Sequence, residues 1–340
     1  MTRNRPRRPL TMAELAGEAG VSVPTVSRVL NGRSEVSEET RRKVMAVIAE
    51  HGPPRLSRPG RAVPRTEAIE LLFHELESTW AIQILWGVQR AAAESGCAVM
   101  VSGLGGRFFP PDTWVEEVVA RRSTAVIAAL SGFTAAQHQR LLAGGVPVVV
   151  LDPPRAPLPN TPWVSATNGA GAASATRHLL ELGHRRIALV AGPEEIPCAF
   201  DRLQGYHAAM ADAGASVTGL VRSVSMNSDE GLVAARELLR VRPTAIVATN
   251  DLQAMGVYEA VREAGLRIPD DVSVVGFDDL SVAAWMSPGL TTVHQPLHDL
   301  AVTATDLVLC LAWGTPVPTL RLELPTHLVV RGSTAPPTPG

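Results

Sequence analysis

Residues 10–32 decide the fold at the start of this chain, and they run Leu10-Thr11-Met12-Ala13-Glu14-Leu15-Ala16-Gly17-Glu18-Ala19-Gly20-Val21-Ser22-Val23-Pro24-Thr25-Val26-Ser27-Arg28-Val29-Leu30-Asn31-Gly32. Leu15, Ala16 and Ala19 recur at helical spacing, and the glycine that follows ends this first helix. A second short helix begins after a tight turn. Two short helices joined in this way are typical of a helix-turn-helix DNA-binding domain.

The second helix has the features of a recognition helix. Ser22 is a good N-cap, and Pro24 lies in the first turn, where a missing N–H costs nothing. The apolar residues that hold one face down are Val26, Val29 and Leu30. The polar residues of the other face are Thr25, Ser27, Arg28 and Asn31. Hydroxyls can contact phosphates and arginine can bond a guanine edge or a phosphate. A small helical bundle with a solvated face is the alternative that spacing alone leaves open.

A third helix completes this predicted domain. It starts at Ser37, has acidic residues in its first turn, and ends at His51-Gly52-Pro53. Its inner face consists of Val44, Val47 and Ile48. Residues 10–52 are therefore predicted to form a helix-turn-helix domain, with a basic disordered arm over 1–9 before it. A linker rich in Pro, Gly and Arg follows over 53–66.

Charge is unevenly distributed along the chain. Residues 1–66 contain 13 Arg and Lys against 6 Asp and Glu, a net charge of +7, whereas residues 67–340 have a net charge of −9. The N-terminal part is suited to approach a polyanion and the remainder is not. Charge alone leaves a basic, solvated tail as the alternative.

Composition excludes several classes of protein. A length of 340 residues predicts two or three domains, and 46% apolar with 19% charged residues is a globular composition. The three cysteines (Cys97, Cys198 and Cys310) lie far apart, which argues against a disulfide scaffold and favours a reducing cytosol. No apolar run approaches the roughly 20 residues that span a bilayer, and no secretory signal is present. We therefore expect a cytoplasmic protein with no membrane partner.

The sequence does not predict an enzyme. The nine histidines show no metal-ligand spacing, so neither a metal nor another cofactor is expected. The segment Gly103-Leu104-Gly105-Gly106 lacks the ending of a phosphate-binding loop and the spacing of a dinucleotide fingerprint. His184, in a turn beside two arginines, is expected to have a structural role.

After the linker, short apolar strands alternate with amphipathic helices. The expected strands are Ala68–Phe73, Ala98–Ser102, Ala125–Leu130, Val146–Leu151, Arg186–Gly192, Ala245–Thr249 and Val272–Phe277. The helices between them include Ala81–Ser95, Gly169–Leu182, Arg202–Ala213 and Leu252–Ala264. This alternation predicts an α/β fold with parallel sheets covered by helices on both faces. The segment is too long for one such core, so two lobes are expected.

Polar side chains follow three of these strands. In chain order they are Asp152, then Asn250 and Asp251, then Asp278 and Asp279. Ligands of open α/β sheets bind beyond the carboxyl ends of the strands, and carboxylates and amides suit the vicinal hydroxyls of a sugar. Capping of the next helix is the alternative for each residue, above all for Asp251.

Residues 10–32 closely resemble the headpiece of the lac repressor family, through the core Val-Ser-x-x-Thr-Val-Ser-Arg-x-Leu-Asn over residues 21–31. The resemblance continues over 36–41 and covers nearly the whole chain. Segments that resemble the family's effector-binding body are Gly183–Ala188, Asn250-Asp251, Val274–Asp279 and Pro288–Val293. The resemblance implies a three-helix headpiece and a two-lobed body with the type I periplasmic-binding-protein-like fold. The implied lobes comprise 67–164 with 295–322 and 165–293 with 323–334, before a disordered tail over 335–340.

The resemblance also implies which headpiece residues contact DNA. Val23 and Pro24 fall where the family's recognition helix chooses its operator, and neither offers a donor, so their contacts would be apolar. Arg28 falls where an arginine contacts base edges. The positions that face phosphates are Thr11, Ser22, Thr25, Ser27, Asn31 and Thr40.

The linker departs from the family pattern. In the family it folds on DNA into a hinge helix whose apolar residue wedges into the minor groove, and Leu56 has that position here. Pro53, Pro54, Pro59 and Gly60 all oppose a helix. An extended arm along a narrow minor groove is the alternative, and the sequence leaves both open.

The family's effector site can be carried over in the same way. Residues at matching positions of sugar-responsive members are Asp152, Arg202, Asn250, Asp278 and Gln295. Trp80 falls where an aromatic ring often stacks on the ligand, and Cys198 where some members have a pocket hydroxyl. Packing is the alternative for both. Nucleobase-binding members use a similar frame, so a sugar effector is expected while a nucleobase or other metabolite stays open.

These observations predict a transcriptional repressor of a carbohydrate-utilisation operon, with palindromic operator DNA and a mono- or oligosaccharide effector as partners. A two-fold homodimer would place two headpieces about one helical turn apart. No apolar heptads follow Val330, so no tetramer is expected. A sugar-binding receptor without DNA function is the alternative from another class, and the DNA-binding motif with no export signal counts against it.

Overall fold

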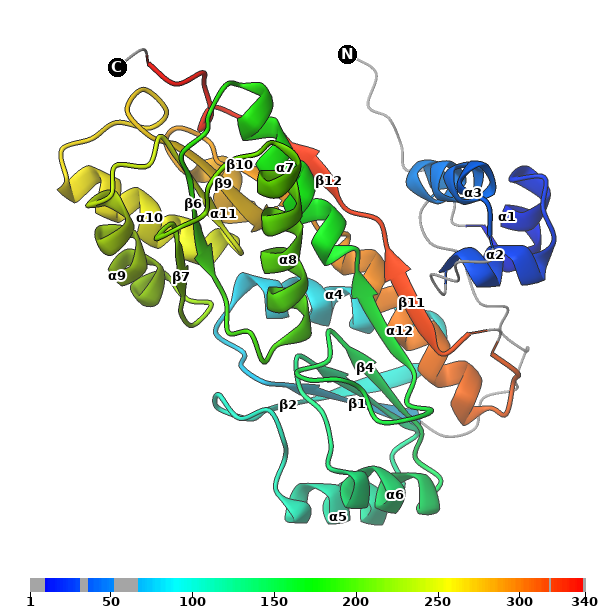
Figure 1. Cartoon of the computed structure of the whole chain (residues 1–340). Coiled ribbons are helices and arrows are strands. Elements are labelled where there is room, and N and C mark those ends of the chain that lie inside the picture. The colour runs from blue at the N-terminus through cyan, green and yellow to red at the C-terminus, as the bar shows by residue number, and fades with distance from the viewer. Residues whose placement is uncertain (1–9, 31–35, 52–66, 318, 339–340) are drawn as a thin grey trace. The chain divides into compact units, whose positions relative to one another are not determined.

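The computed structural model of the chain describes residues 10–30, 36–51, 67–317 and 319–338. Residues 10–51 form the headpiece (Figure 1). The chain, the headpiece included, divides into two compact units. Unit 1 runs to Ala166 and resumes over Pro296–Pro325, and unit 2 comprises Thr167–Gln295 and the segment from Thr326 onward.

Three short helices build the headpiece, and their bounds are α1 Met12–Glu18, α2 Val23–Leu30 and α3 Glu38–His51. A capping box begins α1: the side chain of Thr11 accepts the N–H of Glu14, whose own carboxylate accepts the N–H of Thr11. Ser22 Oγ accepts the N–H of Thr25 at the start of α2, so its predicted capping role is confirmed. The buried apolar residues come from all three helices: Met12, Leu15, Ala16, Ala19, Val26, Val29, Leu30, Val44 and Ile48.

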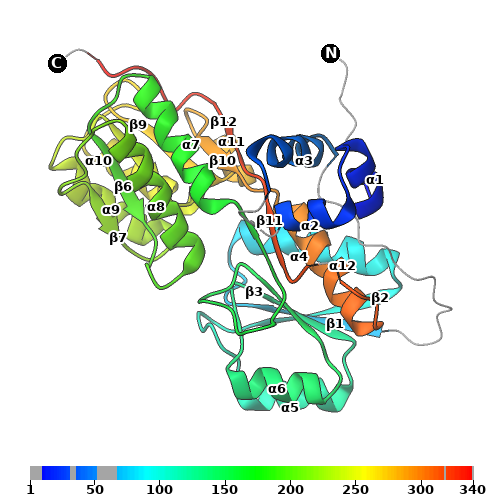
Figure 2. The same ribbon diagram turned by 45° about the vertical axis from the view of Figure 1, so that its right-hand side comes forward.

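Unit 1 contains a six-stranded sheet in which every pairing is parallel. Its strands, in sheet order, are β11 Arg321–Leu324, β5 Trp163–Ala166, β4 Val148–Leu151, β3 Ala125–Ala129, β1 Glu67–Phe73 and β2 Cys97–Gly103. One face is covered by α4 Thr79–Glu94 and α12 Leu297–Ala312, and the other by α5 Asp112–Arg121 and α6 Ala135–Ala143 (Figure 2).

Unit 2 contains a second six-stranded sheet, which is parallel except for one edge pairing, between β10 and β12. Its strands, in sheet order, are β12 His327–Val329, β10 Thr291–His294, β9 Ser273–Asp278, β8 Ala245–Ala248, β6 Ile187–Ala191 and β7 Val221–Ser223. Its helices are α7 Asn168–Glu181, α8 Pro197–Asp212, α9 Ser228–Leu239, α10 Asp251–Glu263 and α11 Ser281–Trp285. Helices α7 and α8 pack together over one apolar core, and α9 and α10 pack together over another.

The predicted fold class is confirmed, with parallel-dominated sheets in two α/β units. The seven expected strands correspond to β1, β2, β3, β4, β6, β8 and β9. The five strands that were not predicted have only three or four residues each: β5, β7, β10, β11 and β12. All five lie at or next to the edge of a sheet. Such segments are too short to show a period, and their strand state depends on their partners in the ladder.

The C-terminal segment differs from the disordered tail expected over 335–340. Its described part, up to residue 338, is bound to unit 2. The carbonyl of Ala335 accepts hydrogen bonds from His184 Nε2 at 2.9 Å and from Ser273 Oγ at 3.1 Å. His184 also contacts Thr244 Oγ1 at 2.9 Å, and burial lowers its pKa. The structural role expected for His184 is therefore observed, with the tail as one of its partners.

Close helix packing in unit 2 depends on glycine. A Cβ added at Gly205 in α8 would lie 2.1 Å from the carbonyl oxygen of Gly169 in α7. The obstacle is backbone, so no side-chain movement can relieve the overlap, and the two helices must separate.

We predict that Gly205→Ala lowers the free energy of unfolding by about 1–3 kcal/mol, the usual range for an overpacked core. Urea denaturation followed by circular dichroism measures the change. Gln204→Ala is the matched control, because Gln204 is the exposed neighbour in the same helix and its replacement should stay within about 0.5 kcal/mol. An unchanged midpoint for Gly205→Ala would contradict the backbone contact.

Candidate functional site

The face of α2 predicted to meet DNA is the exposed face of that helix. Ser22, Val23, Pro24 and Arg28 are exposed, and Thr25 and Ser27 are half-buried. The apolar residues of the opposite face, Val26, Val29 and Leu30, are buried. Arg28 therefore projects its guanidinium from the helix surface, where it can reach a base edge or a phosphate.

The headpiece hydroxyls predicted to face phosphates also make local contacts. Ser22 Oγ lies 2.8 Å from Thr25 Oγ1, and Thr40 Oγ1 accepts from Ser37 Oγ at 2.9 Å. Thr11 is the N-cap of α1. A hydroxyl has a second lone pair after each of these bonds, so the contacts orient the groups without using up their capacity. Asn31 and Leu56 lie outside the described residues, and their roles stay predictions.

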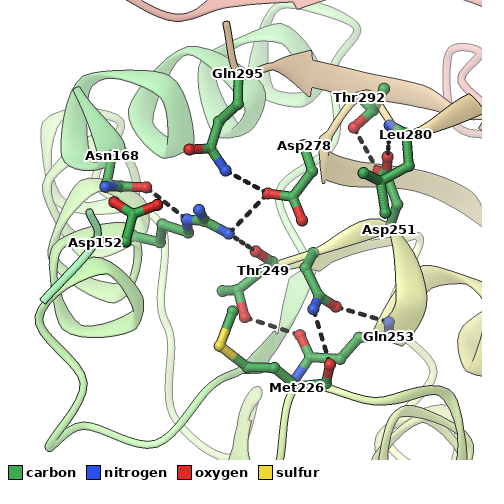
Figure 3. A network of polar contacts seen from close by, with 12 residues as sticks. Asp152, Asn168, Met226, Thr249, Asp251, Gln253, Asp278, Leu280, Thr292 and Gln295 are labelled. Atoms are coloured by element: carbon green, nitrogen blue, oxygen red, sulfur yellow. Dashed lines mark hydrogen bonds and ion pairs between the residues drawn. The ribbon is translucent and has the colours of Figure 1, made fainter. Parts of the chain in front are cut away.

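A buried arginine is the centre of the polar cluster in unit 2 (Figure 3). Arg202 in α8 is 2% exposed, and its Nε donates to Asn168 Oδ1 at 2.8 Å. Its Nη1 donates to the carbonyl of Thr249 at 2.5 Å and to Asp278 Oδ1 at 3.3 Å. The guanidinium carbon lies 3.7 Å from the ring centroid of Phe277. Because a buried charge needs such partners, these contacts determine where the guanidinium lies.

Two more predicted residues join this cluster. Gln295 donates from Nε2 to Asp278 Oδ1 at 2.6 Å, so Asp278 is bonded to both Arg202 and Gln295. Gln295 is 1% exposed, and its Oε1 has no hydrogen-bond partner among the described residues. A buried acceptor in this state can receive an O–H or N–H of a ligand.

Asn250 combines capping with a place beside the cluster. Its Oδ1 accepts the N–H of Gln253 at 2.8 Å, which makes it the N-cap of α10. Its Nδ2 donates to the carbonyl of Met226 at 2.9 Å. It also directly follows Thr249, whose carbonyl bonds Arg202. The capping alternative is thus realised at Asn250 and not at Asp251, whose side chain bonds other elements.

The remaining residues of the predicted effector site are Asp152, Trp80 and Cys198. Asp152 follows β4 in unit 1, is buried, and accepts from Ser165 Oγ at 2.5 Å. Trp80 is the second residue of α4, half-buried, with its ring edge-on to Phe73 at a centroid distance of 6.5 Å. Cys198 is buried in the first turn of α8 in unit 2. Of the predicted effector residues, Arg202 and Gln295 are thus joined through Asp278 in unit 2.

Sequence reasoning missed three members of the unit 2 cluster. Asn168 and the carbonyl of Thr249 bond Arg202, and Thr249 Oγ1 in turn donates to Gln253 Oε1 at 2.8 Å. Asn168 follows β5 by two positions, so the rule for polar residues after strands would have found it if β5 had been predicted. A carbonyl group carries no side-chain signal, so the role of Thr249 O was not accessible from sequence.

The aspartates near this cluster have shifted pKa values. Burial raises the pKa of Asp251 well above its ordinary value, and the nearby charge of Asp278 raises it further. Burial also acts to raise the pKa of Asp279, but hydrogen bonds from His294 and Arg331 outweigh it and leave this pKa lowered. Asp279 is therefore held as a carboxylate by His294 and Arg331, neither of which is a partner of Arg202.

The described residues contain neither a cluster suited to a metal ion nor a helix suited to a bilayer. No group of three or more His, Cys, Asp or Glu is arranged to hold a metal ion in the part of the chain that the structure describes. No helix within the described ranges has the length and apolar character that crossing a bilayer requires.

Comparison with known proteins gives a family match for the headpiece and another for the C-terminal half of the chain. A family model described as bacterial regulatory proteins, lacI family, matches residues 11–52, and one described as a periplasmic binding protein-like domain matches residues 176–334. The ribose operon repressor of Halalkalibacterium halodurans is 33% identical over 327 residues, which cover 95% of this chain and 97% of the relative. The regulator CelR of Thermobifida fusca is 35% identical over 350 residues, with coverage of 97% and 99%.

Two solved structures of transcriptional regulators also match this chain over nearly its whole length. A complex of the transcriptional regulator CelR with cellobiose matches with a TM-score of 0.72 and 33% identity, covering 96% of this chain and all of that one, 100%. The lac repressor dimer bound to operator and the anti-inducer ONPF matches with a TM-score of 0.67 and 30% identity, covering 96% and 100%. Since relatives of this similarity span nearly the whole chain, it belongs to the lacI family of bacterial regulatory proteins, which are transcriptional regulators and not enzymes.

Proposed function

We propose that this protein is a cytoplasmic repressor of a carbohydrate-utilisation operon. As a homodimer it binds a palindromic operator through α2, and a mono- or oligosaccharide bound at the Arg202 cluster changes its affinity for that operator.

The headpiece supports the DNA-binding part. The exposed face of α2 combines hydroxyls with Arg28, and the headpiece match covers the residues that carry this face. The net charge of +7 over residues 1–66 attracts the phosphate backbone, whatever the sequence of the DNA. Arg28 and the apolar pair Val23 and Pro24 would then supply the sequence-dependent contacts.

The buried acceptor of Gln295 is the observation that carries the effector part. Its Oε1 lacks a partner within the described residues, next to a carboxylate and a guanidinium that are already oriented by other bonds. A polyol can donate an O–H to this oxygen and to Asp278, and can accept from Arg202. CelR in complex with cellobiose, and a ribose operon repressor, are among the relatives, which agrees with a sugar. Asp152, Trp80, Cys198 and Asn250 are the further residues that we propose at this site.

Effector binding would act on DNA through differential affinity. A sugar that binds one arrangement of the two units better than another shifts the protein toward that arrangement. The coupling between sugar and operator is expected to be about 1–3 kcal/mol, a change in operator affinity of roughly 5- to 150-fold.

Exposed apolar side chains support dimer formation. In unit 2, Trp285 is 84% exposed and Met255 is also exposed. In unit 1, Trp86 of α4 is 65% exposed, and Met100 and Val101 are exposed on the edge strand β2. Large exposed apolar groups of this kind mark protein–protein contacts, and we propose that they contribute to the dimer interface.

For the operator, we predict that Arg28→Ala raises the Kd for DNA from the protein's own regulatory region by about 10- to 100-fold, because a base contact contributes about 1–3 kcal/mol. Fluorescence anisotropy at a fixed salt concentration measures the Kd. Arg177→Ala is the control, since Arg177 is exposed on α7 outside the headpiece and carries the same charge. Equal affinities for the two variants would refute a role of Arg28 in recognition.

For the effector, we predict that the wild-type protein binds at least one sugar from a panel that includes ribose and cellobiose, and that Arg202→Lys weakens this binding at least tenfold. Lysine keeps the charge but cannot hold Asn168, Thr249 and Asp278 together from one planar fork. Calorimetry measures the affinity, and Arg222→Lys, at an exposed ion pair with Glu237, is the control.

The same calorimetric screen includes nucleobases. Binding of a nucleobase, with no response to any sugar, would show that the effector class is wrong while leaving operator binding intact. Wild-type sugar affinity in Arg202→Lys would instead place the sugar elsewhere.

For the dimer, we predict that Trp86→Glu combined with Trp285→Glu converts the protein to a monomer of 36.0 kDa in sedimentation velocity at micromolar concentration. Burying two carboxylates in an apolar interface is strongly unfavourable. Val233→Glu, at an exposed apolar residue of α9, should leave the dimer intact. A wild-type protein that already sediments at the monomer mass would rule out the proposed assembly.

A further inference from the structure

The carboxylate of Asp251 links three elements of unit 2. Asp251 is the first residue of α10 and has an exposed fraction of 0%. Its Oδ1 accepts the hydroxyl of Thr292 in β10 at 2.6 Å, and its Oδ2 accepts the backbone N–H of Leu280 at 2.7 Å (Figure 3). The function proposed above gives this buried acid no role.

The Leu280 N–H ends a turn with an unusual backbone. Asp278 and Asp279 precede it with φ angles of +110° and +55°, in the left-handed region that favours glycine. Non-glycine residues in this region persist where surrounding bonds hold them. The bond from Leu280 to Asp251 fixes the point at which the chain leaves this turn.

Strand β9 is adapted to the presence of this carboxylate. A Cβ added at Gly276 would lie 2.4 Å from Asp251 Oδ1. Any residue other than glycine at this position would displace the carboxylate or the strand. The close approach is an observation independent of the two hydrogen bonds, and it shows that β9 leaves space for the acid.

The two aspartates of the turn, Asp278 and Asp279, bond different partners. Asp278 Oδ1 accepts from Arg202 and Gln295. Asp279 accepts from Arg331 Nη2 at 2.6 Å and lies 3.0 Å from His294 Nδ1. A change in the turn would therefore move Asp278 away from the guanidinium that it is bonded to.

We propose that Asp251 is a positioning residue: its bonds to Leu280 and Thr292 hold the 278–280 turn so that Asp278 faces Arg202 and is oriented for an effector. Asp251 itself does not touch the effector. The inference rests on the proposed effector site at Arg202, and the experiment separates the two.

Asparagine provides a matched variant. The amide oxygen of Asp251→Asn can accept the Leu280 N–H, and its NH₂ can donate to Thr292 Oγ1, so both bonds are kept. Burial raises the pKa of Asp251, so replacing the acid with a neutral group does not weaken the fold by removing a favourable charge. Asp251→Ala removes both bonds and leaves a buried N–H without a partner.

Hydrogen exchange of the full-length protein, without added sugar, tests the positioning directly. In Asp251→Ala the amides of residues 278–283 should exchange at least about tenfold faster than in the wild type, and Asp251→Asn should keep wild-type protection. Gly276→Ala should deprotect the same amides with Asp251 still present. Amides of α7 serve as the internal reference. Wild-type protection in Asp251→Ala, or equal loss in both Asp251 variants, would overturn the proposal.

Calorimetry with ribose and cellobiose tests the consequence for binding. Asp251→Ala should weaken the binding of the responding sugar at least tenfold, and Asp251→Asn should stay within about threefold of the wild type. A merely structural role would lower the melting temperature and leave the sugar affinity of the folded protein unchanged, and that result would also overturn the proposal. If the wild type binds neither sugar, the exchange experiment still decides the positioning role, and only the effector assignment fails.

Discussion

The buried guanidinium of Arg202 is the constraint that organises unit 2. A cation with 2% exposure is stable only where its donors are matched by acceptors, and here those acceptors come from separate parts of the chain. Asn168 begins α7, Thr249 follows β8, and Asp278 ends β9. Each must be in place before the charge is compensated. The strand ends of unit 2 are therefore held in one arrangement by electrostatics, in addition to the apolar cores on both faces of the sheet.

Other polar side chains of this region also use their two polar atoms separately. Asn250 caps α10 with its side-chain oxygen and donates from its nitrogen to the carbonyl of Met226. Gln295 bonds Asp278 with its nitrogen, and its oxygen has no hydrogen-bond partner among the described residues. Residues that are held by such bonds before a ligand arrives lose little freedom on binding, which is the advantage of a preorganised site. Specificity for one small molecule then depends on the few atoms that these bonds leave available.

The sequence predicted features that depend on neighbours along the chain and missed those that depend on distant partners. The three headpiece helices and the buried face of α2 could be predicted, because helical period, Ser22 as a cap and the apolar positions of α2 are all local. The central strands were found from their apolar runs. The short strand β5 was missed, and Asn168 with it, because its strand state depends on pairing with β4 and β11. For Asp251 the sequence left a ligand contact and helix capping open, and it could not indicate the bonds to Leu280 and Thr292, because these form only when β9 and β10 are side by side. The family resemblance supplied Arg202 and Gln295, which no local pattern indicates.

The path of the chain between the units has a consequence for how the protein is made on the ribosome. Unit 1 is left unfinished at Ala166 and is completed only by Pro296–Pro325, after most of unit 2 has been synthesised. That late segment contains α12, which packs against α4 so closely that a Cβ at Gly87 would lie 2.6 Å from Ala301, and β11, which pairs with β5. During translation the face of α4 that packs on α12 therefore stays uncovered until α12, encoded more than 200 codons downstream, has been synthesised. The headpiece core comes from residues 12–48 alone, so it can form as soon as this segment emerges, whereas unit 1 is complete only after residues 296–325 have been synthesised.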